Sequence, residues 1–451
     1  MNTNLKINNL DSILERALYN AKTNISSRVE TKYSGQVVAC NGQLIESSPF
    51  PASIGSQCTI KTRQGVNVKA EIIGFKENKN LIFPYENNSE IYSGDVISLS
   101  GASKDVEVGS DLLGRVIDGL GQPLDDKGPI KSERTVSING EYINPFDRGE
   151  ISSVLNVGIK SINALTTIGC GQRIGIIAGS GVGKSVLLSM ITQNSEAEVI
   201  VVGLIGERGR ELATFTREIT ASHSNNKVVI VAVPADQSPL LRIQGAKRAT
   251  SIAEHFRDEG KKVLLILDSL TRVAHAQREL GLAVGEQPTS RGYPPSVISL
   301  IPALIERTGV GVKSTGSITS IYTILADGDD TVSDPIVDNA RAILDGHIIL
   351  SRKLAQQGIY PAIDIGNSIS RIMIDLITPE QAKNAQKLRK LISVYQENQD
   401  LLLMGGYVQG QDADLDLAVQ RWPDIVKFLH QDKHTKFSFS DANNMMSELV
   451  A

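Results

Sequence analysis

Ala178-Gly-Ser-Gly-Val-Gly-Lys-Ser185 is the stretch that decides the fold expected for this 451-residue chain. It follows the apolar run 174–177, which is typical of a strand, and precedes the run 186–191, which is typical of a buried helix. A strand, a glycine-rich loop and a helix in this order form a phosphate-binding loop, because glycine leaves the backbone amides accessible to a polyphosphate. The first position of the usual pattern is occupied by Ala178 instead of glycine. The stretch therefore predicts a phosphate site at the edge of a sheet.

Each part of this loop has an expected role. Lys184 can reach the β- and γ-phosphates, and the Ser185 hydroxyl can hold Mg²⁺. The helix that begins here adds free N–H donors and a partial positive charge. The alternative is an incidental glycine-rich connection, which the motifs described below make less favourable. The predicted nucleotide-binding residues are Gly179, Ser180, Gly181, Val182, Gly183, Lys184, Ser185 and Val186.

Composition and charge restrict the class of protein. A chain of 451 residues is too long for one ordinary core, so two or three domains are expected. With 46 Lys and Arg against 50 Asp and Glu, the net charge of −4 argues against wholesale nucleic-acid binding. No apolar run approaches the ~18 residues of a membrane span and no signal peptide is apparent, so a cytoplasmic location is expected. Cys40, Cys58 and Cys170 are predicted to be reduced thiols, and zinc-site spacing is absent.

The N-terminal quarter divides into two segments. Residues 1–24 contain an amphipathic helix with apolar positions from Leu10 to Ala21. Its apolar face either docks on its own protein or binds a partner, and periodicity does not decide between the two. Residues 25–100 carry closely spaced strands with turn signals, which predict a small β-barrel domain. Residues 109–126 are interpreted as a glycine- and proline-punctuated connection. The strands expected in the barrel are 36–40, 43–45, 57–61, 66–73, 80–83 and 95–99.

Residues 101–378 are predicted to form the central domain and residues 379–451 a helical one. Apolar strand-like runs alternate with helical runs in the central part, which indicates a mainly parallel sheet covered on both faces. Ligands of such sheets bind beyond the carboxyl ends of the strands. In the last segment we expect Trp422 to serve packing, and the polar tail from His434 to be loosely held. The expected central strands are 174–177, 199–205, 228–233, 263–267 and 318–325.

Two of these strands end directly at charged residues. Asp268 follows the run 263–267 in the pattern of a Walker B acid, which helps to hold Mg²⁺, although an acid after a strand is often only a helix cap. Glu207 and Arg208 follow the run 199–205. The carboxylate could orient the attacking water and the arginine could offset developing charge. The alternative is a solvated loop of mixed charge, which composition alone slightly favours.

Taken together, the motifs resemble rotary-type ATPases of the F₁/V-type class over nearly the whole chain. Within that class the chain is similar to the protein-export ATPases of bacterial type III secretion. The phosphate loop resembles the flagellar branch, because injectisome relatives usually carry a proline-containing loop. The segment 234–241 is likewise more similar to the flagellar branch than to the injectisome branch. The segments that carry the resemblance are 178–185, 206–211, 268–272, 292–296, 316–319, 334–347 and 358–364.

The resemblance implies roles for further residues. Lys184, Glu207, Arg208 and Asp268 match catalytic positions, and Ser185 matches the Mg²⁺ group. The additional matches are Arg272 as a basic residue near the phosphates, Tyr360 as the aromatic that stacks on adenine, and Arg371 as an arginine finger reaching a neighbouring subunit's nucleotide. From sequence alone, a buried core tyrosine is as good an account of Tyr360. An arginine finger of this kind implies a homohexamer with nucleotide sites between subunits.

The function implied by this resemblance is ATP hydrolysis, with Mg²⁺ as cofactor, coupled to protein export through the flagellar type III apparatus. The implied architecture is an N-terminal β-barrel, a RecA-like P-loop domain with a parallel sheet, and a C-terminal helical domain. A stalk-like regulatory partner at the N-terminal helix, a central stalk protein, the export gate, chaperones and export substrates are the implied partners. The implied location is the cytoplasmic face of the export apparatus, with peripheral membrane association and no nucleic acid.

Three alternatives stay open on the sequence. The first is an injectisome export ATPase. The second is a non-catalytic nucleotide-binding subunit, which the presence of Glu207 together with Lys184 and Arg371 disfavours. The third is a hexameric nucleic-acid motor, for which 4% aromatic residues and net acidity leave little means of stacking bases or following phosphates.

Overall fold

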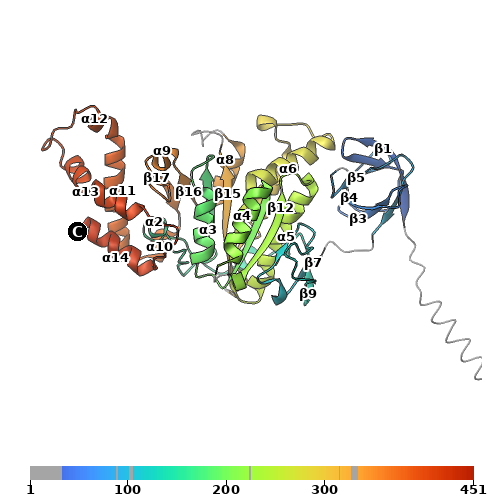
Figure 1. The fold of residues 1–451 in the computed structure, drawn as a ribbon, viewed down its shortest axis with the longest axis horizontal. Helices are drawn as coiled ribbons and strands as arrows, with labels where there is room; N and C mark the ends of the chain where they lie inside the picture. Colours follow the sequence, from blue (N-terminus) through green and yellow to red (C-terminus); the bar gives the residue numbers. More distant parts are fainter. Residues whose placement is uncertain (1–32, 88–89, 101–104, 223–224, 314, 327–333) are drawn as a thin grey trace, which may run out of the picture.

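The computed structural model describes residues 33–87, 90–100, 105–222, 225–313, 315–326 and 334–451. Three parts follow one another along the long axis of the molecule: a β-barrel, a sheet covered by helices, and a group of C-terminal helices (Figure 1). This confirms the predicted architecture. The amphipathic helix predicted within residues 1–24 lies outside the described residues.

Six antiparallel strands close the N-terminal barrel in the order β1-β2-β5-β4-β3-β6. Alternate side chains point inward, and residues such as Ile60, Ile82 and Ile97 are completely buried in its core. This alternation is the pattern that the sequence showed, so the predicted barrel is confirmed. The strands are β1 (Ser34–Asn41), β2 (Leu44–Ser47), β3 (Gln57–Lys61), β4 (Asn67–Lys76), β5 (Lys79–Pro84) and β6 (Val96–Leu99).

Buried polar contacts fix the barrel to helix α5 (Pro239–Asp258) of the central domain. Tyr85 donates from its hydroxyl to Glu71 at 2.8 Å, and the Gln244 amide donates to the same carboxylate at 2.8 Å. The Ser238 hydroxyl, at the N-terminus of α5, donates to the Tyr85 carbonyl at 2.7 Å. Because these groups are buried, the contacts satisfy polar atoms that would otherwise be costly to remove from water.

The central sheet has the strand order β17-β16-β10-β15-β13-β11-β12-β8. Its strands are parallel except for β17, which is antiparallel to β16, and for the short β14, which is antiparallel to β15. The predicted parallel strands correspond to five of these strands. The bounds are β8 (Val116–Ile117), β10 (Arg173–Ala178), β11 (Val199–Glu207), β12 (Val228–Pro234), β13 (Lys262–Asp268), β14 (Gly309–Val310), β15 (Ser317–Leu325), β16 (Gly346–Leu350) and β17 (Ile363–Ser370).

Helices cover both faces of this sheet, as a parallel sheet with nearly continuous apolar strands requires. The cluster that includes Leu188 and Leu212 packs on one face, and the cluster that includes Leu270 and Val297 packs on the other. The carboxyl ends of the parallel strands therefore meet at one edge, where the site is built. The helices are α3 (Lys184–Asn194) and α4 (Gly209–Thr220) on the first face, and α5, α6 (Leu270–Ala283), α7 (Pro295–Ile305) and α8 (Pro335–Ile343) on the second.

The segment 109–126 was wrongly interpreted as only a connection. It contributes β8, which pairs in parallel with β12 and forms an edge of the central sheet. Next to it, β7 (Val106–Val108) and β9 (Arg134–Val136) form a separate two-stranded sheet. Strands of two or three residues are too short to show a periodic pattern, which is why the sequence did not reveal them.

The C-terminal part is helical, as predicted. Tyr395 and Trp422 stack with ring centroids 3.8 Å apart, which confirms a packing role for Trp422. The tail from His434 is not loosely held. Its helix α14 has a capping box at its start and buries Ala442 and Met446, because small and apolar residues recur on one face. The helices are α2 (Lys160–Leu165), α9 (Arg352–Gln356) and α10 (Met373–Leu376) before this part, and α11 (Pro379–Glu397), α12 (Gln399–Leu403), α13 (Ala413–Leu429) and α14 (Phe439–Val450) within it.

Among the helices of the described residues, none combines the length and the apolar character needed to cross a bilayer.

Candidate active site

The phosphate loop lies between the end of β10 and the start of α3, as the sequence predicted. Gly183 is the N-cap residue of α3 with a left-handed φ of 88°, and no side chain caps the helix. The first N–H groups of a helix have no intrahelical partners, so at this terminus they remain available to an anion. The geometry therefore suits a phosphate group, and the first turn of α3 contains no acidic residue that would repel it.

A β-bulge places Glu207 in the site. The register between β11 and β12 shifts between Ile205 and Glu207, and the intervening Gly206 has a φ of 73°. A Cβ at Gly206 would lie 2.8 Å from the Cβ of Arg272, so both the backbone conformation and the packing require glycine here. Bulges redirect side chains at the ends of strands. This one brings the Glu207 carboxylate to the phosphate loop.

Lys184 lies between two carboxylates. Its ammonium group donates to Glu207 Oε1 at 3.2 Å and forms an ion pair with Asp268. Burial raises the pKa of the Glu207 carboxyl above its usual range; Asp268 raises it further, while Lys184 and Arg272 lower it. Desolvation of the carboxylate is thus the dominant effect, even with a lysine in contact.

The Asp268 carboxylate is held by a residue that sequence reasoning missed. Thr323 in β15 donates from its hydroxyl to Asp268 Oδ1 at 2.6 Å. Thr323 and Asp268 lie 55 positions apart in the chain and become neighbours only through the pairing of β13 with β15. No motif marks such a threonine, so only the strand order could have indicated it.

Oxygen donors suited to a hard cation gather beside the loop. Ser185, Glu207 and Asp268 line a common cavity of about 20 Å³ together with Leu204 and Phe215. Hydroxyl and carboxylate oxygens are the ligands that Mg²⁺ prefers. Within the part of the chain that the structure describes, no cluster of three or more His, Cys, Asp or Glu residues could hold a metal by itself. A divalent ion here would therefore share its coordination with phosphate oxygens and water.

Tyr360 lies on the other side of the loop. A Cβ at Gly183 would be 3.4 Å from two carbons of the Tyr360 ring, and the tyrosine is 41% exposed. Val186, which is also exposed, is the third residue of α3. A half-exposed aromatic ring beside a phosphate loop offers a face for a base to stack on. The alternative of a fully buried core tyrosine does not describe this residue.

The three predicted arginines occupy different places. The Arg272 side chain packs against Gly206, and its backbone N–H is capped by the Ser269 hydroxyl at 3.3 Å. The Arg208 side chain is 80% exposed and pairs with Glu211 at 3.4 Å. Of the three predicted arginines, Arg272 is thus the one whose side chain packs against Gly206, next to Glu207.

Arg371 lies near the amino-terminal ends of the parallel strands, whereas the phosphate loop lies at their carboxyl ends. Its backbone N–H donates to Asp345 at 2.9 Å, and Asp345 in turn donates to Arg173, the first residue of β10. Its guanidinium donates to the Arg341 carbonyl at 3.2 Å. The phosphate loop begins five residues further along β10, which is roughly 16 Å at about 3.3 Å per residue. The backbone of Arg371 therefore lies about five strand residues from the phosphate loop of its own chain, beside the start of β10.

Known family models match most of the chain from residue 158 onward. Residues 158–370 match the nucleotide-binding domain of the ATP synthase alpha/beta family, and residues 377–448 match the EscN ATPase C-terminal domain of type III secretion systems. The chain is 45% identical to the flagellum-specific ATP synthase of Pseudomonas aeruginosa over 95% of each chain. The chain belongs to the flagellum-specific ATP synthases. The relative from Salmonella typhimurium is also 45% identical, over 94% of this chain and 95% of its own.

Solved structures of this ATPase family share the fold. The assembled ATPase EscN from the type III secretion system of enteropathogenic E. coli has a TM-score of 0.87 and 40% identity, covering 92% of this chain and 100% of its own. EscN in complex with its central stalk EscO has a TM-score of 0.84 and 39% identity over the same shares. The flagellum-specific relatives confirm the flagellar branch that the sequence predicted, and this chain is an ATPase of the type III secretion class.

Proposed function

We propose that this flagellum-specific ATPase hydrolyses Mg·ATP in a homohexameric ring and thereby energises protein export through the flagellar type III apparatus. The proposal of a ring rests on the separation of the phosphate-loop residues from Arg371 within one chain. Lys184, Glu207 and Asp268 meet at the carboxyl edge of the sheet, whereas Arg371 lies at the opposite edge. A chain with this geometry supplies the phosphate loop to one site and the guanidinium to another.

The residues at the loop would divide the chemistry among them. Lys184 and the free amides of α3 would bind the β- and γ-phosphates, exchanging contacts with carboxylates for contacts with phosphate oxygens. Glu207 would accept a hydrogen bond from the attacking water and orient it towards the γ-phosphorus. Mg²⁺, held by Ser185 and Asp268, would neutralise charge on the phosphates. Arg272 would add positive charge near the phosphates, and Tyr360 would stack on adenine.

The remaining arginines would act across the interface between subunits. Arg371 would stabilise charge that develops on a neighbour's γ-phosphoryl group, as finger arginines do in other nucleotide hydrolases. Arg208, exposed beside Glu207, could join that charge distribution once a neighbouring chain covers it. Each complete site would then need two copies of the chain.

Complementation between two inactive variants tests this arrangement. We expect Lys184→Ala to abolish ATP turnover, and Arg371→Ala to abolish turnover while retaining ATP binding. Rings assembled from a mixture of the two variants should regain turnover, because some interfaces combine an intact loop from one chain with an intact Arg371 from the other. Full turnover by Arg371→Ala alone, or mixed rings that stay inactive, would refute the shared site.

The partners belong to the same proposal. EscN has been solved with its central stalk EscO, and we propose that a corresponding stalk protein binds the ring formed by this chain. Residues 1–24 would bind a regulatory stalk-like partner, and residues 379–451 would face the export gate, chaperones and export substrates. Residues 25–100 would form the barrel unit and 101–378 the ATPase unit. The ring would work at the cytoplasmic face of the export apparatus, without nucleic acid.

A further inference from the structure

The connection between α13 and α14 makes a buried contact with Tyr360. The backbone N–H of Gln431, in this connection, donates to the Tyr360 carbonyl at 2.7 Å. Gln431 is only 4% exposed. A residue of the C-terminal helical part therefore touches the backbone of the aromatic residue beside the phosphate loop.

The Gln431 side chain fixes this connection to the central domain. Its Oε1 accepts from the Lys160 backbone N–H at 2.9 Å, and its Nε2 donates to the Gly158 carbonyl at 2.9 Å and to the Thr435 carbonyl at 3.0 Å. Both ends of the amide are thus engaged, so the side chain has one orientation. It holds the connection against the start of α2 with hydrogen bonds that are shielded from water.

The buried Lys160 also binds this connection, through the carbonyls at the C-terminus of α13. The Lys160 ammonium group donates to the His430 carbonyl at 2.9 Å and to the Lys427 carbonyl at 3.2 Å, at the C-terminus of α13. A cation at this position compensates the unpaired carbonyls and the negative end of the helix dipole. The ammonium also lies 4.8 Å from the centre of the Phe437 ring. The connection is therefore attached on two sides, to α2 and to Tyr360.

From these contacts we infer that Gln431 is a positioning residue for Tyr360, so that the C-terminal helical part sets the adenine-binding surface of the flagellum-specific ATPase. The inference rests on the proposed role of Tyr360 in stacking on adenine. Gln431 itself does not contact the nucleotide in this account, because both polar atoms of its side chain are already paired within the protein. Its effect is to hold the Tyr360 backbone, and with it the ring, beside Gly183.

The test separates binding of the base from binding of the phosphates. In the full-length assembled enzyme, Gln431→Ala should raise KM for ATP about tenfold with little change in kcat, the pattern of lost ground-state binding through a base–aromatic stack. Inorganic tripolyphosphate with Mg²⁺ has phosphates but no base, so its inhibition constant should stay unchanged. An unchanged KM, a fall in kcat alone, or an equal loss of tripolyphosphate affinity would overturn the inference.

Two further comparisons make the result specific. Gln420 is exposed on α13, and Gln420→Ala is the matched control that should leave KM unchanged. Tyr360→Ala should raise KM, and adding Gln431→Ala to it should raise KM no further, because both changes remove the same contact. Additive effects would overturn the inference while leaving the role of Tyr360 intact. If Tyr360→Ala leaves KM unchanged, the proposed role of Tyr360 fails first, and the inference with it.

A second variant serves if Gln431→Ala does not assemble. Gln431→Glu keeps the size of the side chain and the acceptor for the Lys160 N–H, but it loses the donation to Gly158 and Thr435. It should raise KM in the same direction, again with tripolyphosphate inhibition unchanged. A wild-type KM in this variant would count against the inference as clearly as in the alanine variant.

Discussion

The Glu207 carboxylate is proposed to orient the attacking water, and its burial destabilises the ionised form. The residue is only 7% exposed, and Lys184, Asp268 and Arg272 are the charged groups that act on its carboxylate. Burial disfavours the ionised form, and the two cations only partly offset this effect. A pKa raised towards neutrality is common where a carboxylate handles protons in catalysis.

The raised pKa gives a prediction for the dependence of activity on pH. The value of kcat/KM should fall on acidification as Glu207 becomes protonated, because the protonated carboxyl no longer accepts a hydrogen bond from the attacking water. Since kcat/KM reports the free enzyme, the midpoint should lie above the ordinary glutamate value of about 4.3. Glu207→Gln should reduce kcat by about 10²-fold or more and remove this midpoint.

The contribution of Glu207 to the free energy of unfolding should change with pH in the direction opposite to kcat/KM, so it should increase on acidification. The folded pKa of Glu207 is raised, so its contribution to stability is present below the unfolded pKa and is lost as pH rises through the folded value. Glu207→Gln should therefore melt at a higher temperature than the wild type at neutral pH, which thermal denaturation followed by circular dichroism would show. A variant that hydrolyses ATP normally would remove Glu207 from the proposed mechanism.

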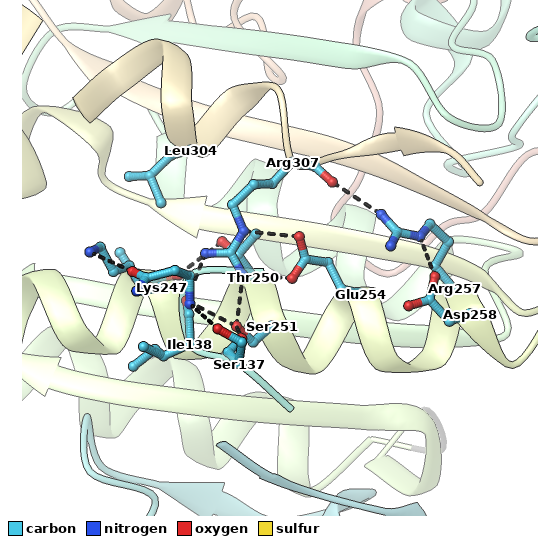
Figure 2. A network of polar contacts seen from close by, with 12 residues as sticks. Ser137, Ile138, Lys247, Thr250, Ser251, Glu254, Arg257, Asp258, Leu304 and Arg307 are labelled. Atoms are coloured by element: carbon cyan, nitrogen blue, oxygen red, sulfur yellow. Dashed lines mark hydrogen bonds and ion pairs between the residues drawn. The ribbon is translucent and has the colours of Figure 1, made fainter. Parts of the chain in front are cut away.

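Helix α5 is the element that joins the parts of the chain. Its N-terminus contacts the barrel, and its C-terminal half carries Ser251 and Glu254, which bind Arg307 (Figure 2). Arg307 donates to both oxygens of Glu254, at 2.9 and 2.6 Å, and to the Ile138 carbonyl at 2.9 Å. This network fixes the segment between barrel and core to the sheet domain.

Breaking this network should be costly. Arg307→Ala leaves the mostly buried Glu254 carboxylate without its cation, which should lower the free energy of unfolding by about 3–5 kcal/mol. The matched control is the exposed pair of Lys390 and Asp414, 2.6 Å apart, where Lys390→Ala should cost no more than about 1 kcal/mol. Denaturant unfolding of both variants measures the two values. Equal effects would show that the network adds no more than a surface ion pair.

The elements that the sequence predicted are those with a local signal. Barrel strands alternate in burial, and the phosphate loop has a fixed order of residue types, so both could be read from short stretches. In contrast, β17 contains Asp364, Gly366 and Asn367, and its register with β16 is irregular, so no period marked it as a strand. Contacts such as Thr323 with Asp268 depend on strand order, which a single sequence does not state.

At the scale of the whole molecule, the two halves of the proposed site, the phosphate loop and Arg371, lie apart in one chain. The phosphate loop lies at the carboxyl ends of the parallel strands and the Arg371 backbone at their amino ends, and β16 and β17 are paired at both ends. The Tyr360 carbonyl in turn accepts a hydrogen bond from the Gln431 N–H, in the connection between α13 and α14. Assembly, rather than closure within one chain, is therefore the means by which the site would be completed.

This separation predicts that ATP turnover depends on protein concentration. Turnover per chain should be low at dilutions where sedimentation shows single chains, and it should rise to a plateau as rings form, because only an interface places Arg371 near a γ-phosphate. Arg371→Ala should show no such rise, although its ATP binding should match that of the wild type at each dilution. Constant turnover per chain under conditions where only single chains are present would contradict the shared site, since each chain would then carry a complete set of groups.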